Sequence, residues 1–377
     1  MDTQQGHLPP AFTPARESAE IGADLTRAIE RVLKSGVYLL GPELEALEAE
    51  LCEIAGHTHA VGVGSGTDAL VITLRALGIG PGDEVIVPAI TAIPTAAAVV
   101  LAGATPVLAD VDPATACLTA ESVASAYTSR TSAAIVVHLY GYPAPMDSLA
   151  AVASDRQIAL IEDMAQAFGA RDGTGSMVGG AGIAGCASFY PTKVLAAVGD
   201  AGAILTDDAE LAAKARLLRS HGHQGEYRHS VIAGNSRLDE IQSAVLRTKL
   251  PHLEGWLARR RNVANMFRRA LGALPEGIVR FQAESAGHAY QVLAARIEDR
   301  DSVRADLAGS GLELLVHYPL TLAEQEALAK FEFVAGDYPE ALAWAREELS
   351  LPTSPQLTDD EITNASSLLT SVLEGRA

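Results

Sequence analysis

One segment of the sequence, SFYPTK, combines two residue types that can do chemistry directly after an apolar run. The hydroxyl of Ser188 can donate to a phosphate, and the amine of Lys193 can form an imine with a carbonyl carbon. A lysine is a useful nucleophile only where burial or a neighbouring cation lowers its pKa. A single lysine in a loop is usually just a solvated charge, so a catalytic role for Lys193 requires further residues of a cofactor site elsewhere in the sequence.

A second segment, IEDMAQ, places Asp163 after the apolar residues of an expected strand. A carboxylate there can pair with a protonated ring nitrogen and hold the ring cationic, which makes the ring an electron sink. The alternative is that Asp163 only caps the segment that follows it. Either role requires Asp163 to lie at the end of a strand.

A third segment, GSGTDAL, places Gly66 and Thr67 at the start of an expected helix. Glycine lets the backbone approach a ligand closely, and the first N–H groups of a helix favour an anion such as phosphate. The segment matches neither a dinucleotide fingerprint nor a P-loop, and such turns are as often structural. The three segments together supply a phosphate cradle, an acid for a ring nitrogen and an imine lysine, which are the contacts that a pyridoxal phosphate (PLP) site requires.

Short apolar runs, separated in several places by helical stretches, would position these segments. The runs cover residues 60–63, 84–88, 105–111, 133–139, 158–163, 185–190 and 202–206. This alternation is typical of an α/β protein with a mostly parallel sheet wrapped by helices. Ligands of such sheets bind outside the carboxyl ends of the strands, which is where the three segments would lie.

The length of 377 residues suits one large and one smaller domain. We expect a polar N-terminal arm over residues 1–20, a large domain over 21–250 and a small C-terminal domain over 251–377. The second boundary follows from a long helix predicted from Asp239 to Lys249 and, past Pro251, on to Leu271.

Composition excludes several classes of function. The formal net charge of −19 would repel a polyanion, so we expect no nucleic-acid partner. The three cysteines have no metal-site or disulfide spacing, so no metal is expected. No apolar stretch is long enough to span a membrane, and the N-terminus has no signal-peptide pattern, so the expected compartment is the cytoplasm.

The sequence resembles the DegT/DnrJ/EryC1/StrS sugar aminotransferases over residues 35–369. The blocks that carry the resemblance include GVGSGTDAL, LGIGPGDEVIVPA, AGATPVLADVDP, IEDMAQAFGA, SFYPTK, GNSRLDEIQSAVLRTKLPHLEGW and VHYP. The resemblance implies the aspartate-aminotransferase fold (PLP fold type I), with a mostly parallel sheet in the large domain and a smaller C-terminal α/β domain.

The resemblance also implies a role for particular residues. Lys193 matches the lysine that binds PLP, Asp163 the acid at the ring nitrogen, and Gln166 the residue near the ring hydroxyl. Phosphate contacts would come from Gly66, Thr67 and Ser188. Asn235 matches a residue that reaches the cofactor of the neighbouring subunit, which implies a homodimer with shared active sites. Candidates for substrate contact are Tyr190, His138, Arg237, His317 and Tyr318.

Two of the substrate candidates have structural alternatives. His138 ends an expected strand and could face the pocket, but a packed, hydrogen-bonded histidine fits the same position. Arg237 could take an anionic substrate group through its guanidinium fork, or it could have a surface or structural role.

The implied reaction moves an amino group from L-glutamate to a keto group of a nucleotide-linked deoxy sugar, with dTDP as the expected nucleotide. The mechanism would be ping-pong, with pyridoxamine phosphate between the half-reactions. One alternative is a sugar dehydratase that uses pyridoxamine phosphate, although such relatives carry histidine in place of Lys193. Another is a non-catalytic, PLP-binding regulatory homologue.

The chain departs from the family pattern near the ring and near the sugar. Ala92 and Ile93 stand where the family has an aromatic residue that stacks on the ring. Val194, Ala196 and Ala201 add methyl groups near Lys193, and LTLAEQEAL replaces the usual His-rich segment after Pro319. The ring's stacking face and the sugar pocket are therefore the least predictable parts of the site.

Overall fold

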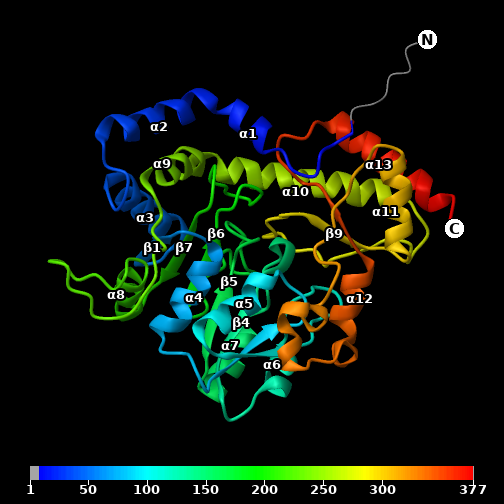
Figure 1. Ribbon diagram of the computed structural model, residues 1–377. Coiled ribbons are helices and arrows are strands. Elements are labelled where there is room, and N and C mark those ends of the chain that lie inside the picture. Colours follow the sequence, from blue (N-terminus) through cyan, green and yellow to red (C-terminus); the bar gives the residue numbers. More distant parts are fainter. Residues whose placement is uncertain (1–7, 377) are drawn as a thin grey trace.

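The computed structural model describes residues 8–376, and its centre is a seven-stranded sheet (Figure 1). The strands are β1 (His59–Val63), β2 (Glu84–Pro88), β3 (Thr105–Ala109), β4 (Thr131–Val137), β5 (Ala159–Asp163), β6 (Ala184–Ser188) and β7 (Gly202–Thr206). They are ordered β1-β7-β6-β5-β4-β2-β3, and only β7 runs antiparallel to its neighbours. The prediction of a mostly parallel sheet is confirmed.

The apolar runs form strands because both faces of the sheet are covered, so every position of β2 and β7 is buried. The helices over the sheet are α3 (Pro42–Ala55), α4 (Gly66–Ala76), α5 (Ile93–Ala102), α6 (Ala120–Ala126), α7 (Met146–Arg156), α8 (Ala209–Leu218) and α9 (Glu240–Lys249). The helices α4, α5 and α8 pack on one face; α6 and α7 cover one part of the other face, and α3 with residues near α9 covers the rest.

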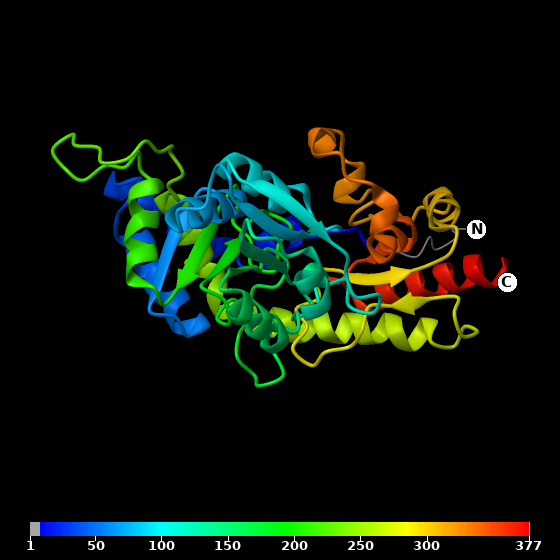
Figure 2. The ribbon, with the colours of Figure 1, turned by 90° about the horizontal axis from the view of Figure 1, so that it is seen from below.

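The remaining strands form a separate antiparallel sheet of three strands (Figure 2). They are β8 (Arg280–Phe281), β9 (Leu293–Arg296) and β10 (Glu348–Leu351), in the order β10-β9-β8. Helices α10 (Leu253–Leu271), α11 (Arg300–Gly309) and α13 (Asp359–Glu374) share one apolar cluster with this sheet. A smaller C-terminal α/β unit is therefore present, as expected.

The apolar cores of the two units do not separate at residue 250 of the chain. Leu253 and Leu257 of α10 belong to the core of the large unit, whereas Val263 and Phe267 of the same helix belong to the small one. The chain between residues 320 and 347 returns to the sheet core of the large unit through side chains that include Trp344. That stretch holds α12 (Pro339–Glu347) and the short 3₁₀ segments Leu322–Glu324, Glu326–Phe331 and Ala335–Asp337. Two further 3₁₀ segments are Leu139–Gly141 and Leu250–His252.

The N-terminal region links the two units. Residues 1–7 of the expected arm lie outside the described residues. The remainder of the arm contains a helix, α1 (Pro14–Glu20), and the chain continues directly into α2 (Gly22–Ser35). Both nitrogens of the Arg16 fork donate to the carboxylate of Glu361 on α13, at 2.8 and 2.7 Å. Glu17 pairs at 2.6 Å with Lys249, at the end of α9. The segment is therefore fastened to both units by charged pairs.

Within residues 8–376, no helix combines the length and the apolar character that crossing a membrane requires. The same residues contain no cluster of three or more His, Cys, Asp or Glu side chains arranged to hold a metal ion.

Candidate active site

The turn between β1 and α4 is built to receive an anion. Ser65 caps α4 by accepting the backbone N–H of Asp68 at 3.1 Å and donating its hydroxyl to the Asp68 carboxylate at 3.0 Å. Gly66 and Thr67 are the first residues of the helix, so their N–H groups have no acceptor inside it. These groups and the positive end of the helix dipole favour a phosphate.

Ser188 lies against this turn. A Cβ on Gly66 would come within 2.6 Å of the Ser188 Cβ, so only glycine fits there. Gly202 pairs with Ser188 across β6 and β7, and a Cβ on Gly202 would lie 2.4 Å from the carbonyl of Ser65. Two glycines thus bring the helix start and the end of β6 together, and the structure joins Gly66, Thr67 and Ser188 in one cradle.

Asp163 ends β5 at the carboxyl edge of the sheet and is buried. Thr95, on α5, donates its hydroxyl to Oδ2 at 2.9 Å, and the backbone N–H of Ala165 donates to Oδ1 at 3.1 Å. Burial raises the pKa of Asp163, while these hydrogen bonds and the charge of Lys193 oppose that rise. The carboxylate is thus held by uncharged donors in a position where a cationic partner would stabilise it.

Lys193 lies in the loop after β6, within electrostatic reach of Asp163. Its backbone N–H donates to the carbonyl of Tyr190 at 2.9 Å, and the buried neighbours Val194 and Leu195 anchor the loop in the core. Burial lowers the pKa of Lys193, and the charge of Asp163 opposes that effect only in part. This is the electrostatic environment that makes a lysine a nucleophile.

Gln166 connects the β5 loop to the small unit. Its Oε1 accepts the backbone N–H of Tyr140 at 2.6 Å, and its Nε2 donates to the hydroxyl of Tyr318 at 3.0 Å. Burial raises the pKa of Tyr318, which therefore stays protonated. Gln166 and Tyr318, which are far apart in the sequence, thus lie together beside Asp163.

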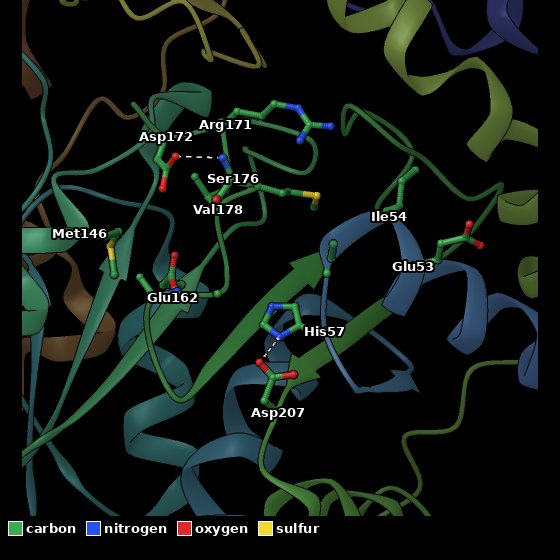
Figure 3. Close-up of a pocket in the computed structure, with 15 residues that line it drawn as sticks. Glu53, Ile54, His57, Met146, Glu162, Arg171, Asp172, Ser176, Val178 and Asp207 are labelled. Atoms are coloured by element: carbon green, nitrogen blue, oxygen red, sulfur yellow. Dashed lines mark hydrogen bonds and ion pairs between the residues drawn. The ribbon is translucent and has the colours of Figure 1, made fainter. Parts of the chain in front are cut away.

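Glu162 and Asp163 are adjacent acids that point to opposite faces of the sheet. Glu162 is fully buried and accepts four hydrogen bonds: the backbone N–H groups of Gly179, Ala181 and Gly182 at 2.7 to 2.8 Å, and His138 Nε2 at 2.9 Å. Burial raises the pKa of Glu162, but these bonds outweigh it and the net shift is downward. Glu162 lines a cavity of about 480 Å³, and Figure 3 shows its side chain there with those of His57 and Asp207.

His138 is not available for a substrate, contrary to one of the two alternatives left open. It is fully buried, and both ring nitrogens are used: Nδ1 accepts the backbone N–H of Ala144 at 3.0 Å, and Nε2 therefore carries the proton that it donates to Glu162. The physical reason is that the ring is fully buried, where an unpaired nitrogen would be costly. The packed, hydrogen-bonded alternative describes this residue.

In the described hydrogen-bond network, the side chains of Tyr190, Asn235 and Arg237 do not bond to the side chain of Lys193, although the Tyr190 carbonyl accepts its backbone N–H. Tyr190 is half exposed. Arg237 bridges to Val63 at the end of β1, and its Nε is buried without a hydrogen-bond partner in the described structure. Asn235 is exposed at the base of a long loop, residues 219–237, that projects away from the molecule (Figures 1 and 2).

His317 borders the site from the side of the small unit. Its Nδ1 lies 2.8 Å from the hydroxyl of Ser350, and its backbone oxygen accepts the hydroxyl of Tyr140. Burial lowers the pKa of His317 to about 4, and the charge of Lys193 adds to that effect. Two substrate candidates, His317 and Tyr318, therefore lie near the predicted catalytic pair. His138 is also adjacent, since its backbone N–H donates to the carbonyl of Asp163 at 3.1 Å, but its ring bonds to Glu162.

The position of the expected stacking residue is occupied by a small side chain. Ala92 is the residue before α5, and Ile93, its neighbour, is exposed. The same helix supplies Thr95 to Asp163, so α5 reaches the site but brings no aromatic ring at residues 92 and 93.

Two residues of the site were missed in the sequence. Thr95 holds Asp163, and Gln291 donates from Nε2 to the carbonyl of Thr192 at 2.5 Å, immediately before Lys193. Thr95 could have been found from the sequence, because it lies three residues after Ala92, the expected stacking position. Gln291 follows no motif, and only the tertiary fold brings it to the lysine loop.

Comparisons with known proteins agree with this geometry. The sequence profile of the DegT/DnrJ/EryC1/StrS aminotransferase family matches residues 19–369. The dTDP-3-amino-3,4,6-trideoxy-alpha-D-glucose transaminase of Streptomyces venezuelae is 44% identical, covering 90% of this chain and 89% of that protein. The UDP-N-acetyl-3-dehydro-alpha-D-glucosamine 3-aminotransferase of Acidithiobacillus ferrooxidans is 40% identical, covering 97% and 96%.

A solved structure shares the fold over nearly the whole chain. The crystal structure of S. venezuelae DesV in complex with a ketimine intermediate superposes with a TM-score of 0.93 at 41% identity, covering 97% of this chain and 98% of that one. The match includes both units and the arrangement of the central sheet. The chain therefore belongs to the DegT/DnrJ/EryC1/StrS aminotransferase family.

Proposed function

We propose that this PLP-dependent aminotransferase moves an amino group from L-glutamate to a keto group of a nucleotide-linked deoxy sugar. The observation that carries the proposal is the meeting of three groups at one edge of the sheet. They are the cradle around Gly66 and Ser188, the buried carboxylate of Asp163, and Lys193 with its lowered pKa. The relatives named for transamination of dTDP- and UDP-linked sugars support the substrate class.

The residues present fit PLP. A phosphate group matches the free N–H groups of Gly66 and Thr67 and the hydroxyl of Ser188. A protonated ring nitrogen would give Asp163 the cationic partner that its uncharged hydrogen-bond donors do not provide. When bound, PLP supplies an electron sink for bond changes at the amino-bearing carbon.

The protein supplies orientation and proton transfer. Thr95 and the N–H of Ala165 fix the carboxylate of Asp163, so that it can hold a ring nitrogen protonated. Nζ of Lys193 would take the proton from the amino-bearing carbon of the donor and, over the two half-reactions, would donate a proton to the carbon of the acceptor that gains the amino group. A lysine whose pKa is lowered by burial is suited to this role, because its neutral, proton-accepting form is more accessible than that of an exposed lysine.

One site would serve both substrates in turn, which predicts ping-pong kinetics. Arg237 is a candidate for an anionic group of either substrate, because its buried Nε has no hydrogen-bond partner in the described structure. His317 and Tyr318 would contact the substrate from the small unit, and Tyr190 would do so from the lysine loop.

We also infer a homodimer with shared sites. The loop of residues 219–237 exposes Tyr227 and Ile232 almost completely, an arrangement that a second subunit would cover. Asn235 lies at the base of this loop and would reach the partner's cofactor. Sedimentation at several concentrations checks the dimer, and a monomer at every concentration would contradict it.

The alternatives predict different observations. A sugar dehydratase would not need the amine of Lys193. A regulatory homologue would bind PLP without turning over L-glutamate. Loss of the visible absorbance of the lysine-bound cofactor on addition of L-glutamate would exclude the regulatory reading.

The deciding experiment is a panel of dTDP- and UDP-linked keto sugars incubated with L-glutamate and the holoenzyme, with products identified by mass spectrometry. We expect one keto sugar to gain an amino group while 2-oxoglutarate forms in equal amount. Turnover of L-glutamate without amination of any sugar in the panel would contradict the proposed acceptor class but not the cofactor chemistry.

A further inference from the structure

A fully buried carboxyl group, that of Glu348, begins a chain of hydrogen bonds that leads to His317. Glu348 and Ser350 are two positions apart on β10, so their side chains lie on the same face of the strand. Oε1 of Glu348 lies 2.5 Å from Oγ of Ser350, which in turn lies 2.8 Å from Nδ1 of His317. The other carboxyl oxygen, Oε2, accepts the backbone N–H of His317 at 2.7 Å.

The hydrogen-bond donors to this carboxyl group are uncharged. Arg300, on α11, donates to the backbone oxygen of Glu348 at 2.6 Å, and its Nε donates to Asp301. Removing a carboxylate from water without a paired cation is costly, so the structure favours the protonated acid. In agreement, burial raises the pKa of Glu348 to about 8, against the smaller effects of the Ser350 and His317 bonds and of Arg300.

The position of each proton follows from the oxygens already in use. With the carboxylate ionised, the Ser350 hydroxyl donates to Oε1. In the protonated acid Oε2 still accepts a backbone N–H, so the acid proton lies on Oε1 and is donated to Ser350. The hydroxyl proton of Ser350 then points to Nδ1 of His317, and the single proton of the neutral imidazole lies on Nε2. After Glu348 ionises, every bond in the chain reverses: Ser350 donates to Glu348, Nδ1–H donates to Ser350, and Nε2 carries no proton.

Other titratable groups face this chain from each element packed against it. They are Arg300 on α11, Arg296 on β9, Tyr140 in the 3₁₀ segment at residues 139–141, Tyr318 beside His317, and Lys193 beyond the imidazole. Burial raises the pKa of both tyrosines, and guanidinium groups stay protonated in proteins. Because the pKa of His317 is about 4, the imidazole is neutral on both sides of the Glu348 titration.

We propose that Glu348 is a positioning residue that decides, through Ser350, whether His317 presents a hydrogen-bond donor or an acceptor at Nε2. Nε2 lies on the side of the ring away from Ser350, and the charge of Lys193 reaches the imidazole. With Glu348 protonated, Nε2–H can donate to a carboxylate or hydroxyl oxygen of a bound substrate. With Glu348 ionised, Nε2 can only accept. The inference concerns protons of the protein itself and does not depend on which sugar is aminated.

Nitrogen NMR of the holoenzyme labelled at histidine tests the proposal, because the two ring nitrogens report directly which one is protonated. The signals of His317 are those absent from a His317→Asn variant. In the wild type, the protonated nitrogen should change from Nε2 to Nδ1 as the pH rises through about 8. In Glu348→Gln, the amide nitrogen donates to Ser350 and does not titrate, so Nε2 should stay protonated throughout.

Glu347→Gln is the matched control, because it makes the same change one residue earlier at a side chain that pairs with Arg280 and Arg296 instead. It should keep the wild-type midpoint. If Glu348→Gln does not fold, Ser350→Ala breaks the same chain and should abolish the change near pH 8. A wild-type His317 with one tautomer over the whole titration overturns the proposal, as does an unchanged switch in Glu348→Gln or Ser350→Ala. No turnover is measured, so these outcomes are independent of the proposed reaction.

Discussion

The adjacent acids Glu162 and Asp163 should respond in opposite ways to removal of their charge. In Glu162→Gln, one carboxylate oxygen becomes an NH₂ group. Each oxygen now accepts two hydrogen bonds, from Ala181 and Gly182 on Oε1 and from Gly179 and His138 on Oε2. The amide therefore leaves two buried donors without an acceptor.

Each such buried donor costs about 1–3 kcal/mol, so Glu162→Gln should lose about 2–6 kcal/mol of unfolding free energy. That is a large part of a typical stability of about 5–15 kcal/mol. Asp163→Asn faces only two donors, Thr95 and Ala165, and loses one bond at most. It also removes a buried charge whose pKa burial has raised, so the net change should stay within about 2 kcal/mol.

The assay is urea unfolding of the cofactor-free proteins, followed by far-ultraviolet circular dichroism at equal protomer concentration, because dimerisation would make stability depend on concentration. Transamination by the cofactor-loaded proteins is measured in parallel. We expect Asp163→Asn to be near wild-type stability but without activity, and Glu162→Gln to be destabilised with activity surviving in the folded fraction. If Asp163→Asn were the less stable variant, or if Glu162→Gln unfolded like the wild type, the division of roles between the two acids would be wrong.

Three further changes test other parts of the site and the fold. Lys193→Ala should keep the wild-type circular dichroism but lose both transamination and the visible absorbance of the lysine-bound cofactor; an undiminished rate would contradict the assignment. Ala92→Phe should add a stacking contact worth about 0.5–1.5 kcal/mol and lower the Kd for PLP about 2- to 13-fold, measured by fluorescence titration; an unchanged Kd would mean that residue 92 does not face the ring. Arg16→Ala removes the main cause of the lowered pKa of Glu361, which is about 2 instead of the ordinary 4.5. Because Arg16 is 42% exposed, we discount the full shift to about 1–2 kcal/mol. That stability is present above about pH 4.5 and is lost as the pH falls towards 2, so unfolding curves of the wild type and Arg16→Ala should converge in acid; a constant gap would refute the linkage.

The positions in the fold of the residues proposed to hold the cofactor could be predicted from sequence for a physical reason. The strands are buried on both faces, so each one is an unbroken apolar run, and a polar residue directly after such a run marks the carboxyl edge of the sheet. Asp163 and Ser188 were found in this way, and they lie at that edge. Gly66 and Thr67 were found by the complementary signal of a glycine turn that opens a helix.

The parts that could not be predicted depend on contacts between distant segments. Alternation along a strand says that Glu162 and Asp163 face opposite sides, but not which side holds the cofactor. Gln291 and Glu348 acquire their roles only when the small unit folds against the lysine loop and the 3₁₀ segment at residues 139–141. No local periodicity carries that information.

The apolar clusters extend across the predicted boundary at residue 250 for a similar reason. The predicted break at residue 250 assumed that each stretch of chain packs with its neighbours in sequence. Trp344 instead lies in the core of the large unit, next to Tyr140, although the strands on both sides of its segment belong to the small unit. A sequence read from one end to the other does not show such a return.

The close contact of Gly66, Ser188 and Gly202 has a consequence for attempts to change the specificity of this enzyme. A Cβ at Gly202 would collide with the backbone of Ser65 at 2.4 Å, and a Cβ at Gly66 would lie 2.6 Å from the Cβ of Ser188, so neither position has room for a side chain. Random libraries that include these codons would consist mainly of inactive clones. Tyr190 and Leu320 are better positions to vary, because both side chains are exposed.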